Sequence, residues 1–229
     1  MKEPMRSWIF IFSAVAFAAG DPLETARNRQ DRAALERLGS ERLKSATTQV
    51  KNAQAQYEAA LAQSYLSEVA LELREKRQAR AAAEAGIQAA RAAVAINTNS
   101  AEYHRVLGTL CGQIIPADPM AGIQHGRCAK EEIEKALKLD PKSALAWVSS
   151  GVGKFYLPAM FGGGVELALK DFQKAAALDP KLAEAWLWIG LAHRKANRNA
   201  DAKQALKKAL ALNPDRVWIK QQLDKTPAQ

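Results

Sequence analysis

Three segments of the chain end in nearly the same way, and this repetition constrains the fold more than any other feature. They are residues 135–141 (KALKLDP), 174–180 (KAAALDP) and 208–214 (KALALNP). Each reads as the end of an amphipathic helix, because Asp or Asn followed by Pro stops a helix and begins a turn. Residues 92–98 (AAVAINT) form a weaker fourth copy. The repetition predicts an array of helical hairpins, and the many alanines agree with it because Ala has the highest helix propensity.

The last copy carries a recognisable motif, with small residues where two helices would cross and large apolar ones in the groove between hairpins. It resembles the tetratricopeptide repeat (TPR) family, with His193 in place of the usual tyrosine. The resemblance covers about residues 67–216 and implies an all-α, right-handed α-solenoid of about three to four helical hairpins. The residues that carry it are Trp186, Ile189, Gly190, Ala202, Leu206, Ala209 and Pro214.

The spacing of the copies indicates two insertions. Pro180 and Pro214 are 34 residues apart, which is the TPR period. The interval from Pro141 to Pro180 is 39 residues, and that from Thr98 to Pro141 is 43. Both excesses fall between the two helices of a hairpin, so we expect insertions in the turns at 114–123 (IIPADPMAGI) and 157–164 (LPAMFGGG).

These features divide the chain into four parts. Residues 1–20 are a predicted signal peptide. Residues 21–66 hold two predicted helices, one over about 23–46 with Gly39-Ser40 as a candidate interruption, and one from about 49 through 67 into the first repeat. Residues 67–216 hold the repeats, at about 67–100, 101–143, 144–182 and 183–216. Residues 217–229 are expected to form a short helix and tail. That helix places Trp218, Ile219 and Leu223 on one face, as a helix that caps the last repeat should.

The N-terminus has the composition of a secretory signal. Lys2 and Arg6 precede the apolar run 8–18 (WIFIFSAVAFA), and small residues follow as candidate cleavage sites. Eleven helical residues span only about 16 Å, which is too short to cross a bilayer. We therefore expect an exported protein, periplasmic or secreted in a bacterial envelope, with no membrane span after cleavage. An uncleaved, membrane-anchored form remains the alternative.

Export bears on the two cysteines, Cys111 and Cys128. An even number of cysteines in an oxidising compartment favours a disulfide, with two buried free thiols as the alternative. With His125 they supply three candidate metal ligands, but no fourth ligand accompanies them and the spacing is not a recurring zinc pattern. No metal site is predicted.

No catalytic residue or cofactor site emerges from the sequence, so no enzymatic activity is predicted. The run 162–164 (GGG) lacks the Lys-Ser/Thr of a phosphate-binding loop. The net charge is +9, but its 33 basic and 24 acidic residues are interspersed, and no nucleic-acid-binding motif is present. Nucleic acid is therefore not an expected partner.

The resemblance to TPR proteins implies a partner-binding groove lined by the first helices of the hairpins. The centre of the groove would be apolar and its C-terminal end basic, which suits an extended or helical peptide with an acidic terminus. The chain would then be a non-catalytic adaptor that binds a protein or peptide. The side chains expected to contact the partner are Arg105, Val148, Val152, Phe155, Leu187, Leu191, Arg194 and Lys195. The same inner face would also carry Glu68, Leu71, Glu75, Glu102, Thr109, Leu145 and Glu184.

A second hypothesis rests on the insertions, which resemble those of exported TPR components linked to TRAP-type transporters. It predicts a transporter-associated protein that holds a small apolar or anionic ligand. The apolar segments Ile114-Ile115 and Met160-Phe161 motivate it. The sequence does not indicate the oligomeric state.

Overall fold

Residues 21–227 are described in a computed structural model, and the predicted signal peptide, residues 1–20, lies outside them. Within the described residues the chain is all-helical, without a strand. The helices are α1 (Pro22–Asn28), α2 (Arg32–Thr48), α3 (Ala53–Glu72), α4 (Lys76–Ile96), α5 (Ala101–Ala117), α6 (Gly122–Leu139), α7 (Ala144–Tyr156), α8 (Val165–Leu178), α9 (Ala183–Lys195), α10 (Asn199–Leu212) and α11 (Val217–Asp224), with short 3-10 helices η1 (Pro119–Ala121) and η2 (Ala159–Phe161).

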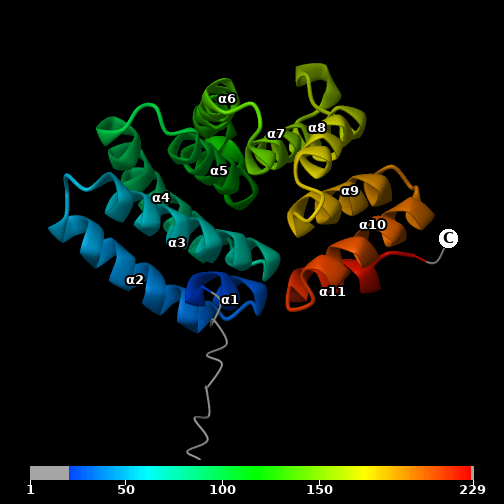
Figure 1. The fold of residues 1–229 in the computed structure, drawn as a ribbon, viewed down its shortest axis with the longest axis horizontal. Coiled ribbons are helices and arrows are strands. Elements are labelled where there is room, and N and C mark those ends of the chain that lie inside the picture. Colours follow the sequence, from blue (N-terminus) through cyan, green and yellow to red (C-terminus); the bar gives the residue numbers. More distant parts are fainter. Residues whose placement is uncertain (1–20, 228–229) are drawn as a thin grey trace, which may run out of the picture.

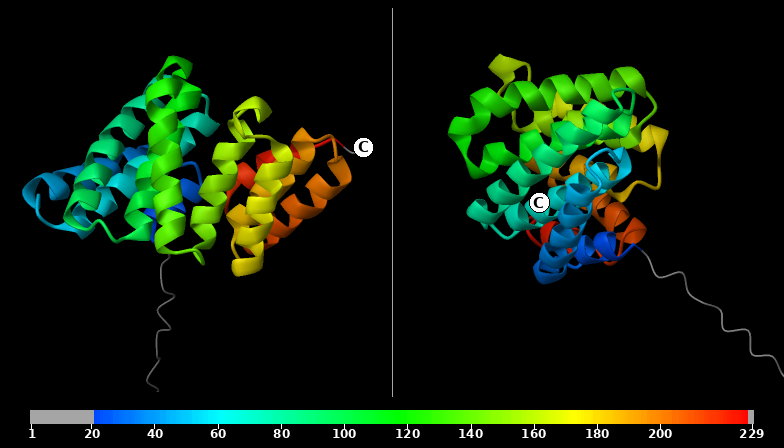
Figure 2. Two further views of the ribbon diagram at one scale, coloured as in Figure 1. Left: turned by 90° about the horizontal axis from the view of Figure 1, so that it is seen from above. Right: turned by 90° about the vertical axis from the view of Figure 1, so that its left-hand side faces the viewer.

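Successive helices pair into hairpins that stack along a curve whose two ends meet (Figure 1). The hairpins are α3–α4, α5–α6, α7–α8 and α9–α10, preceded by α1 and α2. First helices of neighbouring hairpins contact one another, α3 with α5, α5 with α7 and α7 with α9, so they form the inner layer of the stack. The views in Figure 2 show the same succession. The predicted all-α solenoid of helical hairpins is confirmed, with four hairpins.

A glycine lies at the helix crossing in each of the last three hairpins. A Cβ atom added at Gly151 would lie 2.4 Å from the Phe172 ring, and one at Gly190 would lie 2.6 Å from Leu206 Cγ. Gly108 faces Ile133 at a comparable 2.8 Å. A side chain at any of these positions would force the helices apart, so the crossing geometry explains the glycine of the repeat.

The two insertions take different structural forms. In α7–α8 both helices have the lengths found in α9–α10, and the five extra residues all lie in the turn 157–164. In α5–α6 each helix is four residues longer than its counterpart, and the turn 118–121 is one residue longer than the turn 196–198. The first insertion is therefore mostly helical. It extends the hairpin by about one helical turn on each side.

The N-terminal helices depart from the prediction. The break between α1 and α2 falls at residues 29–31, where Gln30 has a positive φ of 53°. Gly39-Ser40, the candidate interruption, lies inside the continuous helix α2. A Cβ atom at Gly39 would lie 2.7 Å from Gln63 Nε2, so this glycine permits close packing of α2 on α3. The prediction of a break there was wrong because a glycine can equally serve a tight contact within a helix.

Helix α11 packs against α10 at the end of the stack. Ile219 is buried, and the partly buried Trp218 and Leu223 join it in an apolar cluster with Leu187 and Leu206. These are the side chains that the sequence places on the packing face. None of the helices in the described residues is long and apolar enough to cross a membrane.

Candidate functional site

The inner layer of the stack contains all eight predicted partner-binding residues, on α5, α7 and α9. Four of them, all apolar, are buried in the structure: Val148, Phe155, Leu187 and Leu191. Val148 and Phe155 belong to a core cluster that Trp188 and the partly buried Val152 also join. A partner could not touch the four buried residues without a rearrangement of neighbouring helices. The predicted contact residues are therefore brought together, but mainly as core.

The three cationic residues of the prediction are engaged within the protein. Arg105 has 12% of its side chain exposed and donates two hydrogen bonds to Glu102. Arg194 donates to the backbone carbonyl and side-chain oxygen of Gln222, at 3.0 and 2.7 Å, near the end of α11. Lys195 donates to the Phe155 carbonyl at 2.6 Å, with its ammonium 4.2 Å from the centre of the Phe155 ring. The expected basic end of the groove thus holds the C-terminal helices together.

Where the two ends of the stack meet, two buried arginines and three partly buried glutamates form a network that we call the seam. Arg27 of α1 donates to Glu68 of α3 at 2.7 Å and to Glu184 of α9 at 2.7 Å. Arg216, the residue before α11, bonds Glu68 at 3.0 Å and also pairs with Glu72. Arg216 further donates to the backbone carbonyl of Arg27 at 3.0 Å. These bonds join α1, α3, α9 and α11 across as many as 189 positions of sequence.

Burial and charge act differently on the carboxylates of the seam. Burial disfavours the charged form of Glu68, but Arg27 and Arg216 outweigh it and lower its pKa to about 2. Burial raises the pKa of Glu72 to about 7, with the charge of nearby Glu68 adding to the effect against the attraction of Arg216. Glu68 is therefore the firmly ionised member of the pair.

The sequence reasoning found part of the seam. It placed Glu68 and Glu184 on the inner face through the helical spacing of the repeats. It did not find Arg27 or Arg216, although Arg216 is only 1% exposed. Arg216 follows Asn213-Pro214 at the start of the capping helix, where an arginine ordinarily faces water. No local pattern distinguishes it from the other arginines of the chain.

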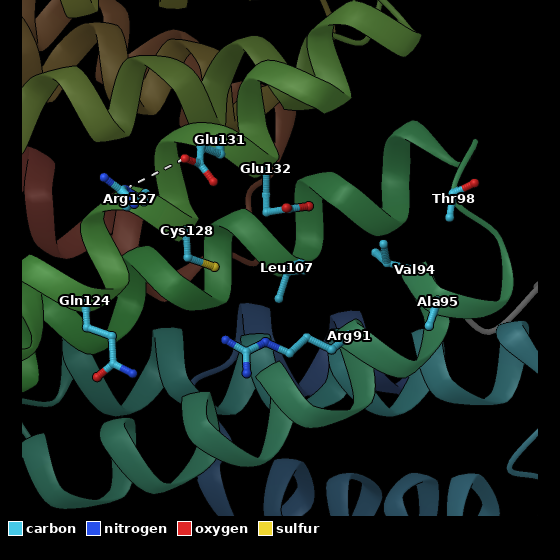
Figure 3. Close-up of a pocket in the computed structure, with 10 residues that line it drawn as sticks. All are labelled: Arg91, Val94, Ala95, Thr98, Leu107, Gln124, Arg127, Cys128, Glu131 and Glu132. Atoms are coloured by element: carbon cyan, nitrogen blue, oxygen red, sulfur yellow. Dashed lines mark ion pairs between the residues drawn. The ribbon is translucent and has the colours of Figure 1, made fainter.

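A pocket of about 420 Å³ opens on the outer side of the stack between α4, α5 and α6 (Figure 3). Val94, Ala95 and Leu107 give it apolar walls, and Arg91 and Arg127 stand at its rim. Its other lining residues are Thr98, Gln124, Cys128, Glu131 and Glu132.

Beside this pocket, a disulfide and a buried histidine connect α5 to α6. Cys111 and Cys128 are bonded, with 6.0 Å between their Cα atoms. The two ring nitrogens of His104 lie 2.5 Å from a carboxylate oxygen of Glu132 and 3.0 Å from the carbonyl oxygen of Thr98. Hydrogen bonds from Lys135 and His104 lower the pKa of the Glu132 carboxyl against the opposing effect of burial. His104 therefore acts as a structural residue, as its place in the repeat suggests.

The cysteines and His125 do not form a metal site, because the two sulfurs are joined to each other. Across residues 21–227 no three His, Cys, Asp or Glu side chains are placed to share a metal ion. The glycines of the turn 157–164 allow a close approach of backbone segments. The Gly164 N–H donates to the Lys154 carbonyl at 2.8 Å, and a Cβ at Gly163 would lie 1.9 Å from the Leu157 carbonyl oxygen.

Two family profiles match the sequence. One, described as Regulator of microtubule dynamics protein 1-3, covers residues 17–160. A tetratricopeptide-repeat profile covers residues 183–216, which is the α9–α10 hairpin. The predicted resemblance to TPR proteins is thereby confirmed. No curated protein matches the chain.

Solved structures similar to this fold include TPR proteins. TTC0263, a thermophilic TPR protein of Thermus thermophilus, is 17% identical with a TM-score of 0.59, over 88% of this chain and 92% of that one. YrrB, described as a TPR protein with an unusual peptide-binding site, is 16% identical with a TM-score of 0.44, over 89% and 98%. PilF of Pseudomonas aeruginosa is 22% identical with a TM-score of 0.46, over 73% and 67%. The first of these supports the TPR-like fold.

Proposed function

Since this chain belongs to the Regulator of microtubule dynamics protein 1-3 family and ends in a TPR hairpin, we propose that it is a non-catalytic scaffold that binds a helical segment of a protein partner on its inner surface. TPR folds are typically scaffolds for protein or peptide partners. The microtubule function in the family's description is that of the proteins for which the family was named, and we do not extend it to this chain.

The observation that carries the proposal is the way helix α1 sits on the inner layer. Leu23 and Ala26 of α1 are buried in an apolar cluster with Leu66 and Val69 of α3. Arg27 reaches Glu68 on α3 and Glu184 on α9, the two inner-face carboxylates at the ends of the stack. Helix α1 thus packs on α2 and α3 and reaches α9 through Arg27, which gives the pattern of contacts that a bound helical segment could copy.

The seating of α1 indicates the chemistry of the partner segment. Such a segment would be a short helix with small or aliphatic side chains on one face and an arginine or lysine that reaches Glu68 and Glu184. This differs from the acidic terminus expected from the sequence, because Arg194 and Lys195 already bond groups of the protein itself. The partner would bind when α1 is displaced.

We further propose an envelope location for this scaffold. The predicted signal at residues 1–20 and the Cys111–Cys128 disulfide are both typical of proteins in oxidising compartments. We place the protein in the periplasm or outside the cell. N-terminal sequencing of the protein purified from its own cells tests whether the signal is cleaved: a start near Asp21 supports a released protein, and a start at Met1 the anchored form. Recovery of the protein in the cytoplasmic fraction would contradict the placement.

The partner hypothesis is tested by a pull-down of residues 21–229 from a cell-envelope extract. The Arg27→Ala variant, with a weakened hold on α1, should retain the same partner more strongly than the wild type. Adding Glu184→Gln to it should reduce retention again, because the partner loses its own carboxylate. A synthetic peptide of residues 21–31 should elute the partner.

Arg37→Ala is the matched control, because Arg37 is exposed and pairs only with Glu41 of its own helix. Circular dichroism establishes that each variant is folded. Equal retention by the wild type, Arg27→Ala and the double variant would contradict binding at the inner surface.

A second candidate function, storage or delivery of a small anionic or apolar ligand beside a transporter, is favoured by the pocket between α4, α5 and α6. Its volume of about 420 Å³ suits a small molecule, and Arg91 and Arg127 offer cations above an apolar wall. Native mass spectrometry of the purified protein would reveal a bound ligand. Detection of the bare protein mass alone would count against this candidate.

A further inference from the structure

The two inserted turns carry most of the strongly exposed apolar side chains in the described residues. Met120 and Met160 are each 83% exposed and Phe161 is 66% exposed, and Tyr156, the last residue of α7 before the second turn, is 62% exposed. Elsewhere in the described residues, only Val50 among the large apolar side chains is more than 60% exposed. Apolar side chains gathered in water at the tips of turns mark a surface that contacts a protein or a membrane.

Both turns lie on the same edge of the molecule. Each joins the two helices of one hairpin, and the left-hand view in Figure 2 shows them together along the upper edge. The turn between α3 and α4 adjoins them, because Arg80 at the start of α4 pairs with Asp118 in the α5–α6 turn at 2.7 Å. We call these three turns, residues 73–78, 118–121 and 157–164, the turn edge.

The turn edge also holds a cationic hollow of about 450 Å³ at the start of α4. It is lined by Arg32, Arg74, Lys76 and Arg77, together with Glu75 and Gln78. The one acid in this lining, Glu75, is already paired with Arg32 at 2.6 Å. Arg74, Lys76 and Arg77 are exposed and make no ion pair within the described part of the chain. Three cations in one hollow are suited to a phosphate group.

We propose that the turn edge docks the protein on an anionic lipid bilayer. Met120, Met160 and Phe161 would enter the headgroup region, and the hollow at Arg74, Lys76 and Arg77 would take a lipid phosphate. The net charge of +9 favours the same surface at longer range. Docking by the turn edge would not involve the seam residues that the proposed protein partner contacts.

The shape of the edge favours a bilayer over a protein as the occupant. Met160 and Phe161 lie in the long turn of the α7–α8 hairpin. Met120 lies in the turn of the α5–α6 hairpin, whose helices are longer than those of α7–α8. A fluid bilayer accommodates separate projecting tips wherever they fall, whereas a protein must offer a matching hollow for each.

The test is flotation of residues 21–229, which contain all the described helices, with vesicles of two compositions. One is phosphatidylcholine mixed with phosphatidylglycerol, and the other is phosphatidylcholine alone. The protein should float with the anionic vesicles only, and added salt should weaken the binding because the attraction is electrostatic. Inorganic phosphate at constant ionic strength should not release it, since free phosphate does not replace the buried tips.

Two variants separate the parts of the proposal. Met160→Ser with Phe161→Ser should weaken binding to anionic vesicles by about tenfold or more, because two apolar side chains no longer enter the lipid. Arg74→Gln with Arg77→Gln should weaken it by several-fold. The matched control is Val50→Ser with Leu139→Ser, which removes exposed apolar groups outside the turn edge and should bind as the wild type does.

Equal binding by the Met160/Phe161 variant and the wild type would overturn the proposal, because charge alone would then explain the attraction. Absence of wild-type binding to either vesicle would overturn it as well. If in that case the Met160/Phe161 variant loses a protein retained by the wild type, the turn edge contacts a protein instead. The pull-down on the inner surface uses other residues, so its result stands independently.

Discussion

The interfaces between successive hairpins and the seam between the two ends of the stack are built in opposite ways. Between and within hairpins the contacts are apolar and close, as where Gly86 of α4 meets Leu110 of α5 and Gly151 of α7 meets Phe172 of α8. At the seam the contacts are ionic and buried, and they depend on Arg27 and Arg216. Apolar burial is spread over many small contacts, whereas a buried ion pair loses most of its stabilisation when one partner is removed. The seam should therefore be the interface that a single substitution can open, so that the two ends of the stack separate.

The largest effect is expected from Arg216→Ala. It removes the cation that pairs with Glu68 and Glu72, and it leaves the Glu72 carboxyl without a cation while Glu68 keeps Arg27. The free energy of unfolding should fall by about 3 to 5 kcal/mol. Urea denaturation measures this loss, and small-angle X-ray scattering should show an expanded molecule if the ring opens while the hairpins persist.

Arg37→Ala provides the reference for an exposed pair and should change the free energy of unfolding by no more than about 0.5 kcal/mol. If Arg216→Ala is as compact and as stable as Arg37→Ala, the ion pairs of the seam do not hold the two ends of the stack together.

The second effect is a pH dependence that the apolar interfaces cannot produce. The pKa of Glu72 is raised to about 7 from an ordinary value of 4.5, so between these pH values the folded protein holds more protons than the unfolded chain. The free energy of unfolding should therefore decrease as pH rises from 5 to 7, by at most about 3 kcal/mol. Glu68 acts in the other direction, because its lowered pKa adds stability above pH 4.5 that is lost as pH falls toward 2.

Melting temperatures of the wild type and of Glu72→Gln across this pH range isolate the contribution of Glu72. The variant should lose the decrease between pH 5 and 7, since glutamine does not titrate. Glu41→Gln, at an exposed pair, should follow the wild type. Parallel curves for all three proteins would mean that Glu72 is ionised throughout the range.

The smallest effect is expected within the apolar stack, from Gly151→Ala. The added methyl group would meet the buried Phe172 ring at 2.4 Å, which costs about 1 to 3 kcal/mol, while the better helix propensity of Ala returns about 1 kcal/mol. The net loss should be at most about 2 kcal/mol in urea denaturation, without a change in overall size.

Gly153 is the matched control for this substitution, because it lies in the same helix and a Cβ there meets nothing within 4 Å. Gly153→Ala should leave stability unchanged or raise it by up to about 1 kcal/mol. If Gly151→Ala behaves as Gly153→Ala does, the crossing is looser than the geometry indicates.

Much of the fold was predictable because its signals are local. The Asp/Asn-Pro stops, the 34-residue interval and the face of the capping helix that carries Ile219 depend on neighbours a few residues away in the chain. The positions of both insertions also followed from these intervals. Their form did not, because the interval is the same 43 residues whether the nine inserted residues lengthen two helices or make a loop.

The candidate site was predicted less well, because it depends on contacts between residues far apart in the sequence. Helical spacing placed Leu187, Leu191, Glu68 and Glu184 on the inner face, but spacing does not reveal whether that face is open or closed.

The sequence by itself determined that this protein is a stack of helical hairpins with a terminal cap, because helix periodicity and helix stops are encoded residue by residue. Only the tertiary structure decided that the stack closes. Closure depends on small rotations accumulated over all the hairpins, and these bring Arg216 to Glu72 across 144 positions and to the Arg27 carbonyl across 189. Where the ends meet, Arg27 and Arg216 join α1, α3, α9 and α11, while the inserted turns remain exposed at the edge.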